Sequence, residues 1–206
     1  MIITFSLLVL LIFALLKKSW IWHIFHHEKV VYLTFDDGPQ EELTQEILQI
    51  LRQENIKATF FCVGDAAGRY PHLMEQIRQQ GHSIGNHTMH HLNGWRTPLK
   101  EYLQDVQEAQ TYLNARYFRP PYGKLTLCQW LKLRKHFHII LWTDISYDWS
   151  PKMTPERCFK RVKSAAKHGG IVVFHDNPKA AANMLQVLPQ FIRMAKENGM
   201  TFKTFD

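Results

Sequence analysis

Two adjacent carboxylates, Asp36 and Asp37, stand where a hydrophobic run breaks into a turn. The preceding segment, Val30–Phe35, is rich in β-branched and aromatic residues and predicts a strand, which Gly38-Pro39 ends. A charged pair at the end of a buried strand is costly unless a metal or an opposite charge compensates it. Two such carboxylates can divide the work, one binding a metal ion and the other accepting a proton from water. A solvated acidic turn is the alternative that this segment alone leaves open.

A second polar cluster, residues 87–91 (HTMHH), follows a short strand predicted at Ser83–Asn86. His87 and His91 are four residues apart, so one helical turn would bring both imidazoles to the same face. That spacing suits a metal ion held by two nitrogens and a carboxylate. Because the chain contains 12 histidines, the spacing alone also fits ordinary loop histidines. We expect His90 to point away from the site.

Three further clusters follow, with the sequences FRPPYG at 118–123, WTDISYDW at 142–149 and IVVFHDN at 171–177. Arg119, which precedes a rigid Pro-Pro turn, can bind a carboxylate through two N–H groups. His175 ends a predicted buried strand with an aspartate within reach, so it is a candidate general acid. Taken singly, each cluster also fits a structural role, as a stiff loop, an aromatic strand end or a hydrogen-bonded histidine.

The segments around these clusters alternate between strand-like and helix-like patterns. Strands are expected at 30–35, 58–63, 83–86, 138–143, 170–174 and 201–205. Amphipathic helices are expected around 43–51 and over 71–81, 97–114, 154–169 and 183–198. This alternation implies parallel βαβ units, in a barrel or in an open doubly wound sheet. In both architectures functional residues gather at the C-terminal ends of strands, where every polar cluster falls.

In this order, the five clusters resemble the motifs of the polysaccharide deacetylases, the NodB-homology domain of carbohydrate esterase family 4. The resemblance extends from about Val30 to the C-terminus. It implies an α/β fold, a distorted (β/α) barrel forming one catalytic domain over 28–206. It also implies a metal-dependent hydrolase that removes N-acetyl groups from an N-acetylated polysaccharide or oligosaccharide, such as a cell-wall, envelope or chitin-like glycan. The products would be acetate and a free amino sugar.

The resemblance assigns a metal centre and a base. Asp36 matches the general base, and Arg119 matches the arginine that orients it. Asp37, His87 and His91 match the ligands of a divalent ion. We expect Zn²⁺, although a site with two histidines and one carboxylate also accepts Co²⁺, Ni²⁺ or Fe²⁺.

The resemblance also assigns the groups around the scissile bond. The backbone N–H of Tyr122 matches the donor to the oxyanion, and His175 matches the general acid. Trp149 and Ile171 match apolar groove positions that would receive the acetyl methyl group, and Pro120 is placed in the same substrate groove.

One departure from the family pattern concerns the acid. The fourth motif is usually D-x-x-D-W, with its first aspartate paired to the general-acid histidine. Counting back from Asp148 gives Ile145 at that position, while Asp144 is one residue early and would face the opposite side of a strand. We therefore expect either that Asp148 or Asp176 orients His175, or that His175 is less strongly tuned as an acid.

Residues 1–25 are expected to form a hydrophobic membrane anchor or a signal segment. Met1–Leu16 is almost purely apolar, and Lys17-Lys18 with nearby tryptophans suits a membrane interface. No basic n-region or small-x-small cleavage site is present, so an uncleaved anchor is favoured. The positive-inside rule alone would place the remainder in the cytoplasm, but two lysines are a small bias. We expect a membrane-anchored protein with an extracytoplasmic catalytic domain, or a secreted one if the segment is cleaved.

Composition excludes several other classes. The 206 residues are 46% hydrophobic and 21% charged, enough for one domain with a substantial core. The net charge of +7 favours acidic polymers as neighbours, but the basic residues are scattered and no nucleic-acid motif is present. Cys62, Cys128 and Cys158 lie far apart without C-x-x-C spacing, which argues against a disulfide framework or a structural zinc site.

Two alternative functions remain open. The same metal site could hydrolyse O-acetyl sugars or small amides, because loops govern the choice of substrate. A non-catalytic, membrane-anchored glycan-binding relic would predict a missing ligand or base. Against this, the sequence retains all of Asp36, Asp37, His87, His91 and His175.

Overall fold

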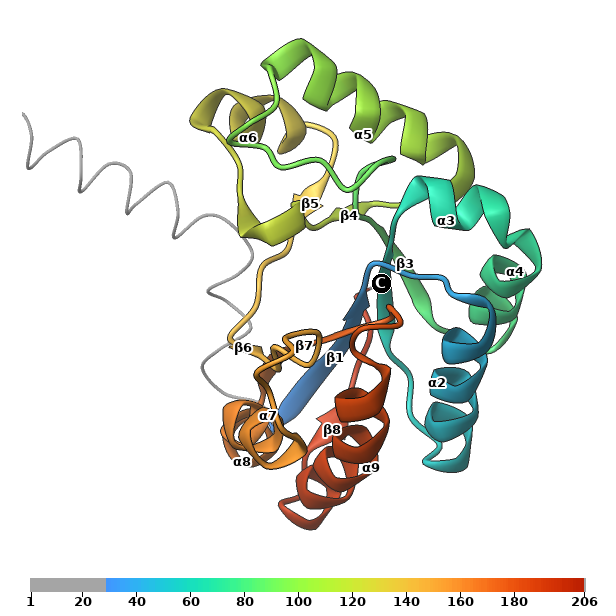
Figure 1. The fold of residues 1–206 in the computed structure, drawn as a ribbon, viewed down its shortest axis with the longest axis vertical. Coiled ribbons are helices and arrows are strands. Elements are labelled where there is room, and N and C mark those ends of the chain that lie inside the picture. The colour runs from blue at the N-terminus through green and yellow to red at the C-terminus, as the bar shows by residue number, and fades with distance from the viewer. Residues whose placement is uncertain (1–28, 206) are drawn as a thin grey trace, which may run out of the picture.

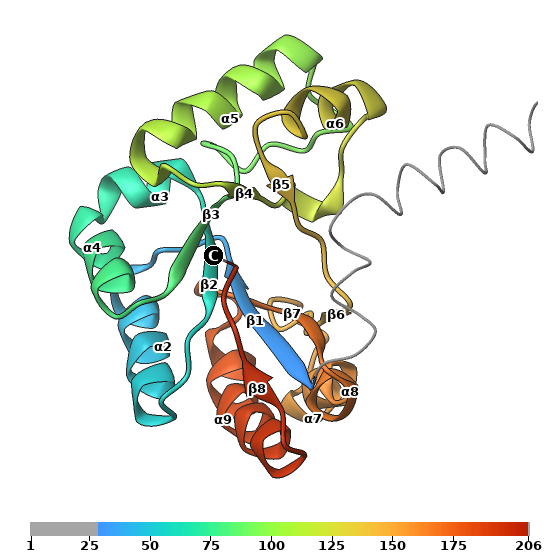
Figure 2. The same ribbon diagram turned by 180° about the vertical axis from the view of Figure 1, so that it is seen from behind.

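Parallel strands in one curled sheet form the centre of the protein (Figure 1). The structure is a computed structural model that describes residues 29–205. Its strands are β1 (Val30–Asp36), β2 (Thr59–Cys62), β3 (Ser83–Asn86), β4 (Tyr117–Phe118), β5 (His138–Ile139), β6 (Asp144–Ile145), β7 (Gly170–His175) and β8 (Thr201–Phe202). Their order is β5-β4-β3-β2-β1-β7-β6, and β8 pairs with the first two residues of β1 (Figure 2).

Helices surround the strands on the outside, as both views show. They are α2 (Glu41–Gln53), α3 (Gly64–Arg69), α4 (Pro71–Gln79), α5 (Leu99–Leu113), α6 (Leu127–Leu133), α7 (Pro155–Val162), α8 (Ala165–His168) and α9 (Ala181–Glu197), with a 3₁₀ turn, η2 (Pro121–Gly123). Thr126 caps α6 through a capping box, and Thr154 caps α7 ahead of a proline at its first turn.

Successive side chains of β1 point alternately to the outer and the inner face of the curled sheet. Leu33 and Phe35 belong to the large apolar core between the sheet and the helices, whereas Thr34 and Asp36 face the inside of the curl. The inside is filled by a second apolar cluster of Phe61, Tyr117, Ile140, Ile171 and Phe205. Each fully buried large apolar side chain contributes about 1.5–3 kcal/mol, so this cluster forms a stable floor beneath the polar strand ends.

The parallel curl agrees with the expected barrel-like architecture, but the strands differ in detail. The segment predicted as one strand at 138–143 pairs only at His138–Ile139. The chain then crosses to the other edge of the sheet, where Asp144–Ile145 pairs with β7. Within residues 29–205 no pairing joins β5 to β6, so the curl stays open there. The short elements β4, β6, α3 and α6 were not expected, because they offer too few residues for a periodic pattern.

The membrane anchor expected at 1–25 lies outside the residues that the structure describes. Within 29–205, no helix combines the length and hydropathy that crossing a bilayer requires.

A substitution at Gly85 in β3 tests how tightly the inner apolar cluster is packed. A Cβ at this position would lie 2.3 Å from the Phe61 ring, which is fully buried. We expect Gly85→Ala to lower the free energy of unfolding by about 1–3 kcal/mol, measured by urea denaturation. Gly68→Ala is the matched control, since its Cβ would meet the half-exposed Tyr112 ring at 3.0 Å and the helix gains an alanine. Equal denaturation midpoints for the two variants would contradict this view of the packing.

Candidate functional site

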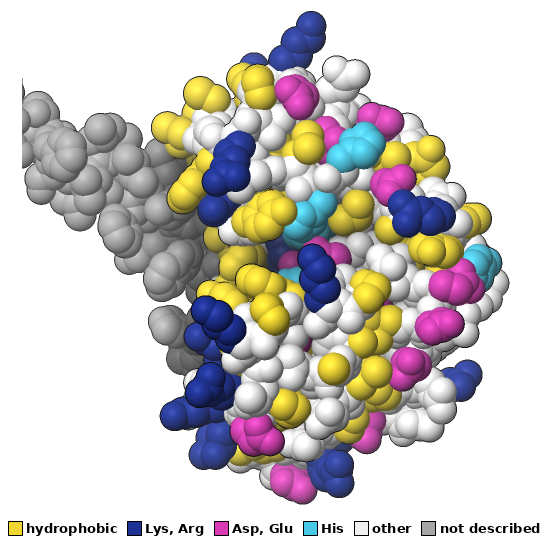
Figure 3. Space-filling view, viewed as in Figure 1, with side chains coloured by type: hydrophobic (Ala, Val, Ile, Leu, Met, Phe, Trp, Pro, Cys, Tyr) yellow, Lys and Arg dark blue, Asp and Glu magenta, His cyan; other side chains and the backbone are white. Residues whose placement is uncertain are grey.

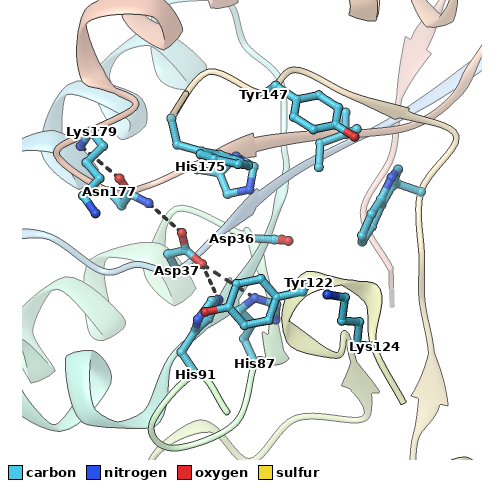
Figure 4. A pocket seen from close by; sticks show the side chains of 13 residues that line it. Asp36, Asp37, His87, His91, Tyr122, Lys124, Tyr147, His175, Asn177 and Lys179 are labelled. Carbon is cyan, nitrogen blue, oxygen red and sulfur yellow. Dashed lines mark hydrogen bonds and ion pairs between the residues drawn. The ribbon is translucent and has the colours of Figure 1, made fainter. Parts of the chain in front are cut away.

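The predicted polar residues converge on one cavity of about 350 Å³ at the C-terminal ends of the strands (Figure 4). Asp36 and Asp37 come from the end of β1, and His87 and His91 from the loop after β3. His175 is the last residue of β7. Because all strands are parallel, these ends share one rim although the residues are far apart in sequence.

Asp37, His87 and His91 could hold a metal ion. One ligand atom from each lies within 4.8 Å of the others. The Asp37 Oδ1 atom is 3.1 Å from His91 Nε2 and 3.6 Å from His87 Nε2. His87 Nδ1 donates to the backbone oxygen of Arg119 at 2.7 Å, which leaves the Nε2 lone pair directed at the cluster. The donor set and its orientation therefore fit a divalent ion such as zinc.

The protonation states favour metal binding at neutral pH. Burial lowers the pKa of His87 to about 4, despite the carboxylates of Asp36 and Asp37 nearby. Burial alone would raise the pKa of Asp37, but the hydrogen bond with His91 and the histidine charges hold it well below its usual range. A neutral imidazole and an ionised carboxylate are the forms that coordinate metal ions.

The two histidines meet through an irregular loop, so the expected helical turn is wrong. Thr88 and His91 both have positive φ, 67° and 56°, which folds the loop back on itself. Asp105 of α5 holds the loop by accepting the backbone N–H and the ring Nδ1–H of His90. His90 therefore points away from the cavity, as predicted.

Asp36 forms a buried ion pair with Arg119. The Arg119 Nη1 atom donates to Asp36 Oδ1 at 2.6 Å and to the Thr34 hydroxyl at 2.7 Å. Nη2 donates to the backbone oxygen of Leu141 at 3.1 Å, and the guanidinium lies 4.0 Å from the centre of the Phe61 ring. Arg119 thus binds the carboxylate through one nitrogen rather than by the expected bidentate contact, while Nε and Nη2 donate to the backbone oxygens of Ile140 and Leu141.

His175 is oriented by Asp148, one of the two predicted partners. The ring Nδ1–H of His175 donates to Asp148 Oδ1 at 2.7 Å, and its backbone N–H donates to Oδ2 at 2.9 Å. Burial alone would lower the pKa of His175, but the hydrogen bond and charge of Asp148, with Asp37 and Asp36, raise it. The arrangement leaves Nε2 as the atom that can exchange a proton with a ligand.

The other acidic residues near His175 have different surroundings. Asp176 accepts the Thr44 hydroxyl at 2.6 Å, and burial raises the pKa of Asp176 to about 7. Asp144 does not line the cavity, whereas Ile145 does. The departure from the family motif therefore places the apolar side chain of Ile145 in the wall, and Asp148 pairs with His175 instead of a residue at position 145.

Two of the three predicted groove residues are not in the groove. Pro120 and Ile171 are buried and do not border the cavity. Ile171 points to the same side of β7 as His175, but it lies four residues earlier and packs in the apolar floor. Trp149 does line the cavity, and Tyr122, Trp142, Ile145 and Tyr147 complete its apolar wall.

Asn177 is a site residue that the sequence reasoning missed. Its side-chain amide donates to Asp37 Oδ2 at 2.7 Å (Figure 4). The contact turns the other carboxylate oxygen, Oδ1, toward His87 and His91. Asn177 stands two residues after His175 in the last cluster, but nothing in the sequence indicates its partner 140 positions earlier.

Comparison with known proteins gives a consistent match. The family model for polysaccharide deacetylase matches residues 25–136. A peptidoglycan-N-acetylglucosamine deacetylase of Bacillus cereus is 30% identical over 89% of each chain. A chitooligosaccharide deacetylase of Azorhizobium caulinodans is 32% identical over 74% of this chain and 76% of its own. The crystal structure of a peptidoglycan N-acetylglucosamine deacetylase, 30% identical, superposes with a TM-score of 0.81 over 87% of each chain.

Removal of the Asn177 amide should weaken metal binding. We expect Asn177→Ala to bind zinc about ten-fold more weakly, because Asp37 loses the hydrogen bond that orients it. Isothermal titration of the metal-free protein measures this without reference to activity. Asn198→Ala, which removes an amide at the end of α9, should keep the original affinity. Equal affinity in the Asn177 variant would show that Asp37 is held by other contacts.

Proposed function

The chain belongs to the polysaccharide deacetylase family, and we propose that it is a metal-dependent hydrolase that removes N-acetyl groups from a cell-wall glycan. The observation that supports this most is the convergence of three groups on one cavity. They are a carboxylate paired with an arginine, a three-residue metal cluster and a histidine paired with an aspartate. Hydrolysis of an amide requires a base for water, a stabiliser for the carbonyl oxygen and an acid for the nitrogen.

Asp37, His87 and His91 would hold the metal ion, with Zn²⁺ as the favoured ion. When bound, a divalent ion supplies a Lewis acid that polarises the acetamide carbonyl and makes water more acidic. Asn177 keeps Asp37 in the orientation that faces both histidines. The low pKa of His87 keeps its ring neutral and able to donate a lone pair.

Asp36 would accept the proton of the attacking water. Its ion pair with Arg119 fixes the carboxylate, so one oxygen stays directed into the cavity. Protonated His175 would then donate a proton from Nε2 to the departing sugar nitrogen, because Asp148 occupies Nδ1. Base and acid are thereby separate residues with opposite charge partners.

The cavity wall would position the acetyl group. Trp149, Tyr147 and Ile145 provide apolar surface that suits a methyl group. The backbone N–H of Tyr122 would donate to the carbonyl oxygen as negative charge develops, a contact typically worth about 3–4 kcal/mol. Tyr122 has a φ of 59°, a conformation that non-glycine residues adopt mainly where the surroundings impose it.

A cell-wall glycan is the substrate class that we favour. Similar proteins are named for peptidoglycan and for chitooligosaccharide, so an N-acetylglucosamine unit is the part that their substrates share. Such a polymer lies outside the cytoplasm, which is consistent with our proposal of a membrane-anchored or secreted protein with an extracytoplasmic catalytic domain.

Acetate release tests the proposed function. N-acetylglucosamine oligomers and peptidoglycan fragments would be assayed as purified, after chelation, and after zinc or cobalt is restored. We expect chelation to abolish release, metal to restore it, and Asp36→Asn to lower it by at least about 100-fold while metal binding is retained. Asp65→Asn, at an exposed position in α3, is the control and should keep activity. Bound metal without release from any glycan would instead favour O-acetyl sugars or small amides.

Replacement of Asp148 tests whether this carboxylate tunes His175 as the general acid. Without the carboxylate the pKa of His175 falls, and a general acid must be protonated to act, so activity is lost at a lower pH. We expect Asp148→Asn to move the alkaline limb of the pH–kcat profile to lower pH and to lower kcat by about 10- to 100-fold. Asp144→Asn, a neighbouring aspartate outside the cavity, should leave the profile in place. An unchanged profile in the Asp148 variant would show that Asp148 does not tune His175 as the general acid.

A further inference from the structure

Two lysines border the cavity on opposite sides. Lys124 follows η2, and Lys179 lies in the segment after β7 (Figure 4). Neither contributes to the metal cluster or to the base and acid described above. Their positive charges therefore need another explanation within this site.

Neither lysine is neutralised by a carboxylate in the part of the chain that the structure describes. The carboxylates inside the cavity have other partners, since Asp36 pairs with Arg119, and Asp37 with the site's histidines and Asn177. No carboxylate of the described residues therefore competes with an entering ligand for either ammonium group.

Aromatic rings hold the Lys124 ammonium in place. Its Nζ atom lies 5.1 Å from the centre of the Trp95 ring and 6.0 Å from that of Tyr122. Trp95 is 66% exposed, and its indole N–H is bound to the backbone oxygen of Leu125. Cation–π contacts of this kind orient a lysine without cancelling its charge. Trp95 and Lys124 together form a positively charged surface beside the cavity.

A third cation lies behind the cavity wall. The Arg161 guanidinium stacks on the Tyr147 ring at 4.3 Å, and Tyr147 borders the cavity. On the face seen in Figure 3, hydrophobic side chains border most of a hollow in which histidine and carboxylate side chains are visible, with a Lys or Arg side chain at its edge and others further out. The charge of the rim agrees in sign with the net charge of +7.

A neutral glycan would leave the two ammonium groups at the edge of the site without a complementary charge. Its hydroxyls can be bound by uncharged donors and acceptors, whereas a lysine ammonium offers three donors, no acceptor and a full charge. A carboxylate is the complementary group, since a charge-assisted hydrogen bond is roughly twice as strong as a neutral one.

We propose that Lys124 and Lys179 select an N-acetylated glycan that carries carboxylates on the sugars flanking the one that is deacetylated. This inference rests on the proposed function and narrows its substrate to an acidic polymer. The two lysines lie on opposite sides of the cavity, so each would bind the substituent of a different flanking sugar. The Trp95 ring would support the sugar on the Lys124 side, as exposed aromatic faces do for sugar rings.

Three glycans of equal length test the proposal on the full-length protein with zinc bound. One is a tetramer of N-acetylglucosamine. The second is a peptide-free peptidoglycan tetrasaccharide, whose alternate sugars carry a lactyl carboxylate. The third is the same tetrasaccharide with its carboxylates converted to neutral amides. The ratio of kcat/KM between the second and third glycans isolates the effect of charge from that of shape.

The wild-type ratio should exceed one and should fall as salt rises from 50 to 500 mM, since rim charges are screened. We expect Lys124→Gln and Lys179→Gln each to lower the ratio about three-fold, and the double variant about ten-fold. Lys100→Gln, at an exposed position in α5 outside the cavity, is the matched control and should leave the ratio unchanged. Titration of the acidic and amidated glycans into an Asp36→Asn background measures the same preference as binding.

A ratio of one, or a ratio that survives both lysine substitutions, would overturn the inference. Release from the neutral tetramer would at the same time keep the proposed function intact, so the two failures are distinguishable. Loss of release from all three glycans with metal bound would remove the proposed function, and the charge selection with it.

Discussion

The buried ion pair between Asp36 and Arg119 is the constraint on which the rest of the site depends. Arg119 is fully buried, and a lone charge in that position would cost several kcal/mol. Thr34 and the backbone oxygens of Ile140 and Leu141 stabilise the pair further by accepting other guanidinium N–H groups. Strand β1, strand β4 and the crossing segment must therefore hold one relative position. That requirement links the register of the sheet to the direction of the Asp36 carboxylate.

The same principle of paired charges, applied with the opposite sign, governs His175. A cation accompanies the carboxylate proposed as base, and an anion, Asp148, accompanies the imidazole proposed as acid. One pair holds a carboxylate against a guanidinium, and in the other the carboxylate of Asp148 raises the pKa of the His175 ring. The metal cluster of Asp37, His87 and His91 lies beside both groups. A single rim of parallel strand ends thus provides three distinct electrostatic environments within one cavity.

These environments are stacked in layers along the strands. Apolar side chains such as Ile171 fill the bottom of the curl, and Thr34 with Arg119 forms a polar layer above them. The site residues form the next layer, and the lysines lie outermost at the solvent. Strand alternation produces this order, because every second residue of β1 and β7 faces inward at successive heights. The dry floor also strengthens the interactions above it, since charges interact more strongly where water is excluded.

Sequence by itself determined the residue types, their order and the strand ends on which they stand. Asp36, Asp37, His87 and His175 could be found because each follows or ends a segment with a readable hydrophobic pattern. Tertiary structure decided which of them meet. Asp148 contacts His175 across 27 positions and Asn177 contacts Asp37 across 140, and no local pattern encodes either pairing. Ile145 lies in the wall and Ile171 in the floor because the depth of a side chain depends on strand register, which pairing between distant strands sets.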